Sequence, residues 1–274
     1  MFRRLKARAV AKPEWGSTHL EPWFPNSPEK IGEMWFEEPA DPLLIKFLFT
    51  TGKLSVQVHP NDAYAREHHN SRGKTEMWHI LEAAPGATIA MGFREPVTRE
   101  KLWEATRTGE VEHLLHWAPV KAGETYFIPA HTVHAIGAGI VLCEIQQNSD
   151  VTYRLWDYGR PREIHVEKAV PLCDLGVHSG ASRAVPIGNG REELVCSRHF
   201  VTELVTLKPG ESFQPAAEEC QLWICLEGRG AIGAEAFQPG EVWLLPDDGE
   251  QPAIGADSAA HFLRTWVPAG QRYR

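Results

Sequence analysis

The sequence predicts a mainly β protein built from barrels or jelly rolls. Beyond residue 195 the apolar runs are short and strand-like, and they lie at 200–207, 222–226, 241–245 and 261–267. Turns of the Pro-Gly type separate them, at Pro209-Gly210 and Pro239-Gly240. Many short strands with turn signals between them are typical of all-β barrels and jelly rolls.

The first half follows the same β scheme, with a few short helices inserted. We expect strands at 43–49, 54–59, 75–82, 87–93, 125–128, 134–136, 139–146 and 151–157. Helical patterns lie at 63–69, 97–107, 110–117 and 163–170. Lys46 interrupts the first strand, so it is either an edge residue or a lysine directed into a pocket. Residues 1–40, rich in Pro, Trp and Gly, are expected to be irregular, with a basic surface arm at their start.

The two halves share a weak sequence repeat, which indicates two related β-barrel units. The pattern Gly-x5-Pro occurs at 123–129 and again at 240–246. A stretch rich in Pro, Gly and Ser lies between the halves, near residues 171–190. We therefore expect a first barrel domain at 1–175, a linker at 176–189 and a second β domain at 190–274.

Composition excludes several classes of protein. The 274 residues carry a formal net charge of −8, which argues against broad nucleic-acid binding. No apolar run is long enough to cross a membrane, and no signal-peptide core follows the basic start, so the expected location is cytoplasmic. The five cysteines include no Cys-x-x-Cys pair, and their odd number fits a reducing compartment.

One strand in the first half carries an unusual polar face. Ser55, Gln57 and His59 alternate with apolar residues, so they point to the same side of the strand. An unpaired buried polar group costs about 1–3 kcal/mol, so this face needs partners. We expect Glu76 and His134 to be those partners, with a divalent metal ion between them.

The metal hypothesis depends on the combination of residues. Gln57 and His59, two apart on one strand, can point at one ion, and Glu76 can reach it from a neighbouring strand. His134 follows a Pro-x4-His turn that suits a barrel mouth. Each residue alone would usually be structural or solvated. In the second half the cysteines and histidines lack ligand spacing, and we expect no metal there.

Four segments together resemble one enzyme family. They are Gln-Val-His-Pro-Asn-Asp at 57–62, Gly-Lys-Thr-Glu-Met-Trp at 73–78, Ile-Pro-Ala-His-Thr-Val-His-Ala-Ile-Gly at 128–137, and Gln-Gln-Asn-Ser-Asp-Val-Thr-Tyr-Arg-Leu-Trp-Asp-Tyr at 146–158. In order and spacing they resemble the type I mannose-6-phosphate isomerases, in the short bacterial form of these cupin enzymes. The likeness covers most of residues 10–175. His131 departs from it, because the family usually has glycine there, and this bears on the turn before His134.

The resemblance implies a fold and a set of site residues. The fold would be a cupin-type double-stranded β-helix, or jelly roll, with a degenerate, metal-free cupin in the C-terminal part. One Zn²⁺ per chain would be held by four ligands: Gln57, His59, Glu76 and His134. Arg154 would be the active-site arginine, Lys74 would lie near the substrate, Ser55 near its phosphate, and Glu144 would point inward.

The implied reaction interconverts mannose 6-phosphate and fructose 6-phosphate through an enediol. Zinc would stabilise the charge that develops on the oxygens of C1 and C2. We expect Arg154 to act as the electrostatic clamp, since arginine stays protonated. The proton-transferring base stays open among Glu144, Lys74 and a water on the zinc.

The expected partner is a small sugar phosphate, with no nucleic acid and no membrane, and the chain is expected to be a monomer or homodimer. Two rival functions follow from the same residues. The first is a metal-dependent cupin dioxygenase that uses iron, against which Gln57 argues because such sites usually begin with His-x-His. The second is a non-catalytic sugar-binding cupin, against which the presence of Lys74, Glu144 and Arg154 argues.

Overall fold

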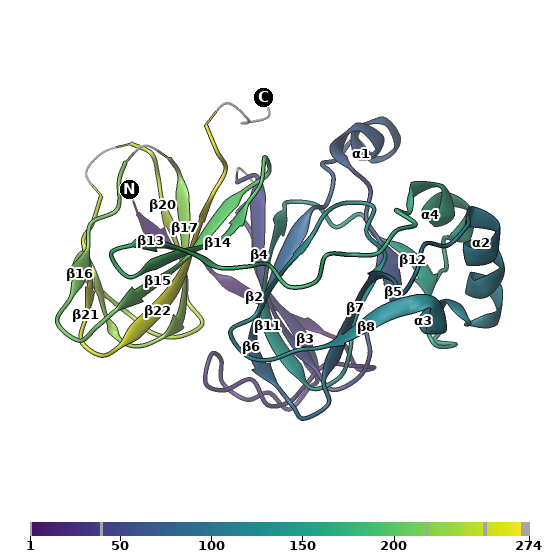
Figure 1. The fold of residues 1–274 in the computed structure, drawn as a ribbon. Coiled ribbons are helices and arrows are strands. Elements are labelled where there is room, and N and C mark those ends of the chain that lie inside the picture. The colour runs from purple at the N-terminus through teal and green to yellow at the C-terminus, as the bar shows by residue number, and fades with distance from the viewer. Residues whose placement is uncertain (1, 39–40, 218, 249–250, 270–274) are drawn as a thin grey trace.

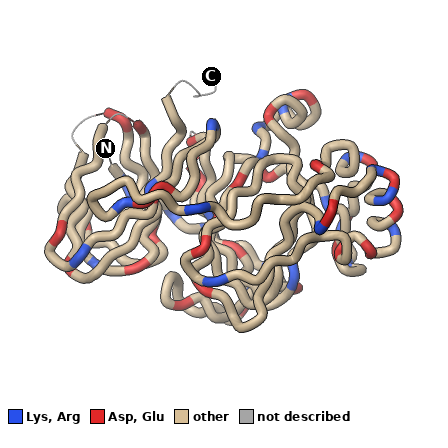
Figure 2. Tube along the Cα trace, viewed as in Figure 1, with Lys and Arg blue, Asp and Glu red and all other residues tan. Residues whose placement is uncertain are grey.

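The chain folds into two β barrels that pack side by side (Figure 1). The structure, a computed structural model, describes residues 2–38, 41–217, 219–248 and 251–269. Strands dominate and the helices are few and short, which confirms the predicted fold class. Charged residues of both signs follow one another along the helices at one end of the molecule (Figure 2).

The first barrel is made of two antiparallel sheets. Its six-stranded sheet has the spatial order β2 (Ala7–Ala11), β3 (Ile31–Phe36), β4 (Leu43–Thr50), β11 (Ile140–Gln147), β6 (Glu76–Ala83) and β9 (Thr125–Ile128). Its five-stranded sheet has the order β12 (Tyr153–Trp156), β5 (Val56–Val58), β10 (His134–Ile136), β7 (Thr88–Phe93) and β8 (Leu115–Pro119). Apolar side chains from both sheets, among them Trp78, Leu142 and Met91, form one core inside this barrel.

The second barrel repeats this plan. Its seven-stranded sheet has the order β1 (Arg3–Arg4), β20 (Val242–Leu245), β17 (Gln221–Glu227), β22 (Ala260–Trp266), β15 (Val201–Leu207), β14 (Arg191–Cys196) and β13 (Val185–Gly188). Its four-stranded sheet has the order β16 (Ser212–Phe213), β21 (Ile254–Ala256), β18 (Gly230–Ile232) and β19 (Glu235–Phe237). The series β20-β17-β22-β15 matches β9-β6-β11-β4 of the first barrel, strand for strand.

The barrels meet through the outer faces of their large sheets. Phe47 and Ile145 of the first barrel belong to the same buried cluster as Ile224 and Leu263 of the second. Burial of such side chains contributes roughly 25 cal/mol for each Å² removed from water, so the interface holds the two barrels together. The domain limits 1–175, 176–189 and 190–274 stay a prediction, and their last residues, 270–274, lie outside the described part of the chain.

Helices cover the outer face of the five-stranded sheet, at the end remote from the second barrel (Figure 1). They are α1 (Asp62–His69), α2 (Arg99–Thr108), α3 (Val111–Leu114) and α4 (Val166–Ala169), followed by a 3₁₀ turn, η1 (Val170–Leu172). Asn61 caps α1, since its Oδ1 accepts the Tyr64 N–H at 3.0 Å. Thr98 caps α2 in the same way.

Two sequence expectations are wrong. The helix expected at 110–117 ends at Leu114, because Leu115 pairs with Phe93 and the chain continues as strand β8. The N-terminal region is not an irregular segment, since it contains β1, β2 and β3. Arg3 and Arg4 of the expected surface arm are exposed, but they form a strand. β2 is an exposed edge strand with no alternating apolar pattern, and β1 is fixed by pairing with β20. Both strands depend on pairing with a distant segment of the chain, so hydrophobic periodicity along the sequence could not reveal them.

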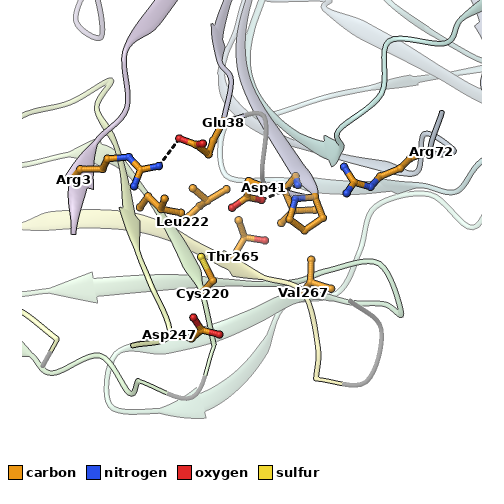
Figure 3. A pocket seen from close by; sticks show the side chains of 12 residues that line it. Arg3, Glu38, Asp41, Arg72, Cys220, Leu222, Asp247, Thr265 and Val267 are labelled. Carbon is orange, nitrogen blue, oxygen red and sulfur yellow. Dashed lines mark hydrogen bonds and ion pairs between the residues drawn. The ribbon is translucent and has the colours of Figure 1, made fainter. Parts of the chain in front are cut away.

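A cavity of about 340 Å³ lies at the seam between the barrels (Figure 3). Asp41 lies on its wall with its side chain buried, and Oδ1 accepts the Leu43 N–H at 2.8 Å. Burial raises the pKa of Asp41 to about 6, with Glu38 adding to the shift and Arg72 opposing it. The folded protein therefore holds a proton here that the unfolded chain releases near pH 4.

This shift predicts how Asp41→Asn changes stability with pH. Because the folded-state pKa is raised, the charged carboxylate costs stability as pH rises from about 4 to about 6. The amide keeps the hydrogen bond to Leu43 without that cost. We expect the variant to be more stable than the parent by up to about 3 kcal/mol at pH 7, with the difference vanishing near pH 4. Urea unfolding across this range measures it, and a pH-independent difference would contradict the assignment.

Candidate active site

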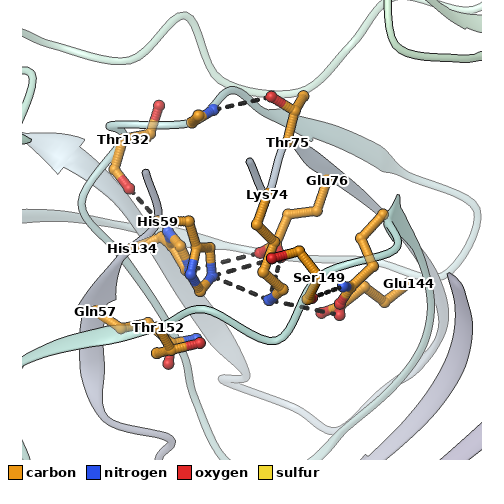
Figure 4. Close-up of polar contacts among 12 residues, drawn as sticks. Gln57, His59, Lys74, Thr75, Glu76, Thr132, His134, Glu144, Ser149 and Thr152 are labelled. Carbon is orange, nitrogen blue, oxygen red and sulfur yellow. Dashed lines mark hydrogen bonds and ion pairs between the residues drawn. The ribbon is translucent and has the colours of Figure 1, made fainter. Parts of the chain in front are cut away.

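Three fully buried side chains meet inside the first barrel: His59 after β5, Glu76 at the start of β6 and His134 at the start of β10 (Figure 4). His59 Nε2 lies 3.6 Å from Glu76 Oε2, and His134 Nε2 lies 3.4 Å from Glu76 Oε1. Two ligands of a tetrahedral zinc ion, each about 2.0–2.2 Å from the metal, are about 3.3–3.6 Å apart. The spacing of these atoms fits a shared metal ion.

The orientation of both imidazoles is fixed by backbone carbonyls. His59 Nδ1 lies 3.1 Å from the Val151 oxygen, and His134 Nδ1 lies 2.8 Å from the Thr132 oxygen. A carbonyl only accepts, so each Nδ1 carries the proton and each Nε2 keeps its lone pair. Such support of the second ring nitrogen is what metal-bound histidines usually have.

The unpaired atoms of the cluster also fit a metal. His134 Nε2 and Glu76 Oε1 are buried and lack a hydrogen-bond partner within the described part of the chain. Burial lowers the pKa of His134 to about 4 and lowers that of His59 well below its usual range, so both are neutral at pH 7. Two neutral imidazoles and a carboxylate form a donor set that binds divalent metals.

Lys74 lies between this cluster and the neighbouring pocket. Its Nζ is 3.0 Å from His59 Nε2, 2.7 Å from Glu76 Oε2 and 3.9 Å from Glu144 Oε1. Burial works to lower the pKa of Lys74, but the two carboxylates together raise it. Burial raises the pKa of Glu76 to about 7 against the opposing effect of the ammonium group. Lys74 is therefore the charged partner of a buried carboxylate pair.

Glu144 is held in place by a second lysine. Lys46 Nζ lies 3.2 Å from Glu144 Oε1 and 2.6 Å from Gln146 Oε1, and the Trp78 indole N–H donates to Glu144 Oε2 at 3.3 Å. Burial would raise the pKa of Glu144, but Lys46 and Lys74 lower it overall. Of the two alternatives for Lys46, the structure supports the pocket: this side chain is buried and lines the cavity described next.

The adjoining pocket, about 340 Å³ in volume, is rich in positive charge. Ser55, Gln57, Lys74, Glu144 and Arg154 all line it, so the structure brings these expected residues together. The cations on its wall outnumber the carboxylates: Lys12, Lys46, Lys74, Arg154 and Arg162 against Glu33, Glu144 and Asp150. An anionic ligand would therefore find a favourable local field in a protein of net charge −8.

Arg154 is supported by a residue that the sequence analysis missed. Its N–H donates to His165 Nδ1 at 3.1 Å, and the His165 N–H donates to the Arg154 carbonyl at 2.7 Å. The Arg154 Nε is buried and has no hydrogen-bond partner within the described residues. Arg162 was also missed, and its guanidinium binds both oxygens of Asp157. Both residues lie outside the four motifs, so only their position in the fold reveals them.

Gln57 lies next to the cluster and outside its contacts. On the five-stranded sheet it pairs with His134 on one side and with Arg154 on the other. Its side chain is half-buried, and no dashed contact joins it to His59, Lys74 or Glu76 (Figure 4). Its part as a fourth ligand stays a prediction.

The structure also bears on the membrane question. Among the described residues, none of the helices combines the length and the apolar character that crossing a membrane would require.

Similarity to known proteins shows which family the chain belongs to. A scan against models of protein families found no match. Over 217 residues the chain is 37% identical to mannose-6-phosphate isomerase of Streptococcus mutans, a match covering 75% of this chain and 68% of that protein. Over 141 residues it is 45% identical to mannose-6-phosphate isomerase ManA of Bacillus subtilis, covering 49% of this chain and 44% of that protein.

The fold leads to the same family. The crystal structure of mannose 6-phosphate isomerase from Bacillus subtilis matches with a TM-score of 0.86 and 26% sequence identity, over 96% of this chain and 99% of that one. The neighbours are cupin-fold proteins, which agrees with the two barrels described above. From its sequence relatives and its fold together, the chain belongs to the mannose-6-phosphate isomerases, a family of cupin-fold enzymes.

Proposed function

We propose that this chain is a zinc-dependent aldose–ketose isomerase that interconverts mannose 6-phosphate and fructose 6-phosphate. The observation that carries the proposal is a buried His59–Glu76–His134 group beside a cation-lined pocket. The names of the relatives support the substrate, since both sequence relatives are mannose-6-phosphate isomerases.

The residues that would hold the metal are His59, Glu76 and His134, with Gln57 as the proposed fourth ligand. Zinc bound there would supply a Lewis acid that stabilises negative charge on the substrate oxygens at C1 and C2. The chain's own part is to keep both imidazoles neutral and correctly turned, through their carbonyl partners and their burial.

The pocket walls would bind the phosphate. Ser55 offers a hydroxyl on the pocket wall for this task, whereas the Arg154 guanidinium, whose Nε lacks a protein partner within the described residues, is left for the enediolate. Arg162 lines the pocket while Asp157 holds two of its donor groups, which leaves its remaining donors for a ligand. Arginine suits this task because its fork binds phosphate oxygens through paired charge-assisted hydrogen bonds.

Glu144 and Lys74 are the groups we propose for proton transfer. A base removes the proton from C2, the C–H electron pair forms the C1–C2 double bond, and the C1 carbonyl pair moves onto its oxygen. The O2 proton passes to O1, the proton returns to C1, and a carbonyl forms at C2. The cations around Glu144 lower its pKa, which keeps it ionised as the base, while Lys74 stays protonated beside the developing charge.

We further propose that the chain divides into a catalytic domain at 1–175, a linker at 176–189 and a metal-free domain at 190–274. We also propose that it resides in the cytoplasm as a monomer or homodimer. The dioxygenase and sugar-binding alternatives are decided by the first experiment.

The first experiment follows turnover of mannose 6-phosphate in a coupled isomerase assay. We expect chelation to abolish turnover and zinc to restore it, because the proposed chemistry needs a Lewis acid. Oxygen uptake by the iron-loaded protein is measured in parallel. If the zinc-loaded protein turns over no substrate, the isomerase proposal fails, and oxygen uptake would then favour the dioxygenase.

A second prediction concerns the buried carboxylate. Glu76→Gln keeps the shape of the side chain but removes the negative charge that faces both imidazoles. We expect its zinc affinity to fall at least ~100-fold, because an uncharged amide replaces a ligand. Zinc content after dialysis measures this, and Glu82→Gln, an exposed position on the same strand, is the control. Equal zinc content in Glu76→Gln and the parent would show that this carboxylate binds no metal.

A third prediction concerns Arg154. Arg154→Ala removes the cation proposed to stabilise the enediolate, and we expect kcat to fall by about 10²–10³ with an unchanged circular dichroism spectrum. Arg66→Ala on the exposed face of α1 is the matched control and should retain parental turnover. Near-parental kcat in Arg154→Ala would refute its role.

A further inference from the structure

His131 adopts a backbone conformation that few side chains accept. It lies in the turn Pro129–Thr132, where the Thr132 N–H donates to the Pro129 carbonyl at 3.1 Å, and its φ is +77°. Glycine adopts this left-handed region freely, whereas a residue with a Cβ does so against steric repulsion. A histidine holds this conformation only where the contacts around it offset the strain.

The imidazole has a defined partner. His131 Nε2 accepts the Asn61 N–H at 3.2 Å, so one ring nitrogen serves a backbone group on another segment. The His131 N–H donates to the His59 carbonyl at 2.8 Å. Two bonds from one residue thus hold the chain just after His59 against the turn that leads to His134.

The segment that leads to Glu76 contacts residues 60–62 as well. The Lys74 N–H donates to the Pro60 carbonyl at 3.0 Å, and the Gly73 N–H donates to Asp62 Oδ1 at 2.9 Å. A Cβ at Gly73 would lie 2.5 Å from the Asn61 carbonyl carbon, so the two segments are in direct contact. Residues 60–62 therefore lie between the segment that carries Glu76 and the turn that carries His131.

We propose that His131 is a positioning residue for the metal centre. Its ring holds residues 60–62 in place and so fixes the His59 imidazole relative to His134 and Glu76. The inference rests on the proposed function, since it concerns the geometry of the same three ligands. It extends that function to a residue that is neither one of the three buried metal-site residues nor one of those that line the pocket.

Two substitutions distinguish the effect of the backbone conformation at residue 131 from the effect of the imidazole. His131→Gly relieves the left-handed backbone and keeps the N–H bond to His59, but it removes the acceptor for Asn61. His131→Gln restores an acceptor at similar reach and keeps the backbone strain. Asn189→Gly is the control, because Asn189 also has a positive φ, at +53°, but is exposed in the second half of the chain. Zinc affinity is measured by competition with a chromophoric chelator, and the Tm of the chelated protein is measured alongside.

We expect His131→Gly to bind zinc about 10-fold more weakly than the parent, while its chelated form keeps or raises its Tm. His131→Gln should recover most of that affinity, and Asn189→Gly should match the parent. Parental zinc affinity in His131→Gly, or no recovery in His131→Gln, would overturn this inference and leave the proposed function intact. An absence of zinc binding in the parent protein would instead overturn the proposed function.

Discussion

The site depends on one constraint, the burial of the Glu76 carboxylate in the interior of a β barrel. A buried charge is expensive unless it has partners, and burial raises the pKa of Glu76 to about 7. The surroundings offset this cost with an ammonium group from Lys74. The two neutral imidazoles turn the lone pairs of their Nε2 atoms toward the carboxylate, so they do not balance its charge. Lys46 and Lys74 likewise offset the charge of Glu144, which lines the pocket. A bound divalent cation would complete the charge balance, which is why we propose one there.

The second barrel has a similar arrangement of strands but no carboxylate at the position that corresponds to Glu76. On three neighbouring strands the first barrel has Trp78, Glu144 and Lys46, and the equivalent register of the second has Trp223, Arg264 and Glu203. The charges are reversed, and Arg264 Nη1 lies 3.3 Å from Glu203 Oε2 as a buried pair. At the positions of the proposed ligands the matching residues by strand order and pairing are Gln221 for Glu76, Ile254 for His134 and Phe213 for Gln57. A carboxylate and an imidazole have thus given way to an amide and an apolar side chain, and the barrel interior is filled by its own core.

Motifs revealed more of the site than of the fold. His59, Glu76 and His134 could be predicted because their chemistry, spacing and family resemblance agree, and the structure brings them together. Lys46 had two interpretations, since a lysine in an apolar strand is an edge residue or a pocket residue until its neighbours are known. Arg162 and His165 lie outside the motifs, and only the return of the chain after β12 brings them to the pocket. Local periodicity failed where pairing with a distant strand decides the conformation, as for Leu115, whose partner Phe93 ends an expected helix early.

The metal site is tested most directly by a crystal structure of the zinc-loaded protein with anomalous data collected at the zinc edge. We predict one anomalous peak in the first barrel, about 2.0–2.2 Å from His59 Nε2, from a Glu76 carboxylate oxygen and from His134 Nε2, with the Lys74 ammonium moved toward the pocket. A peak bound by other residues, or a zinc-free cluster in which Lys74 still contacts His59 and Glu76, would contradict it.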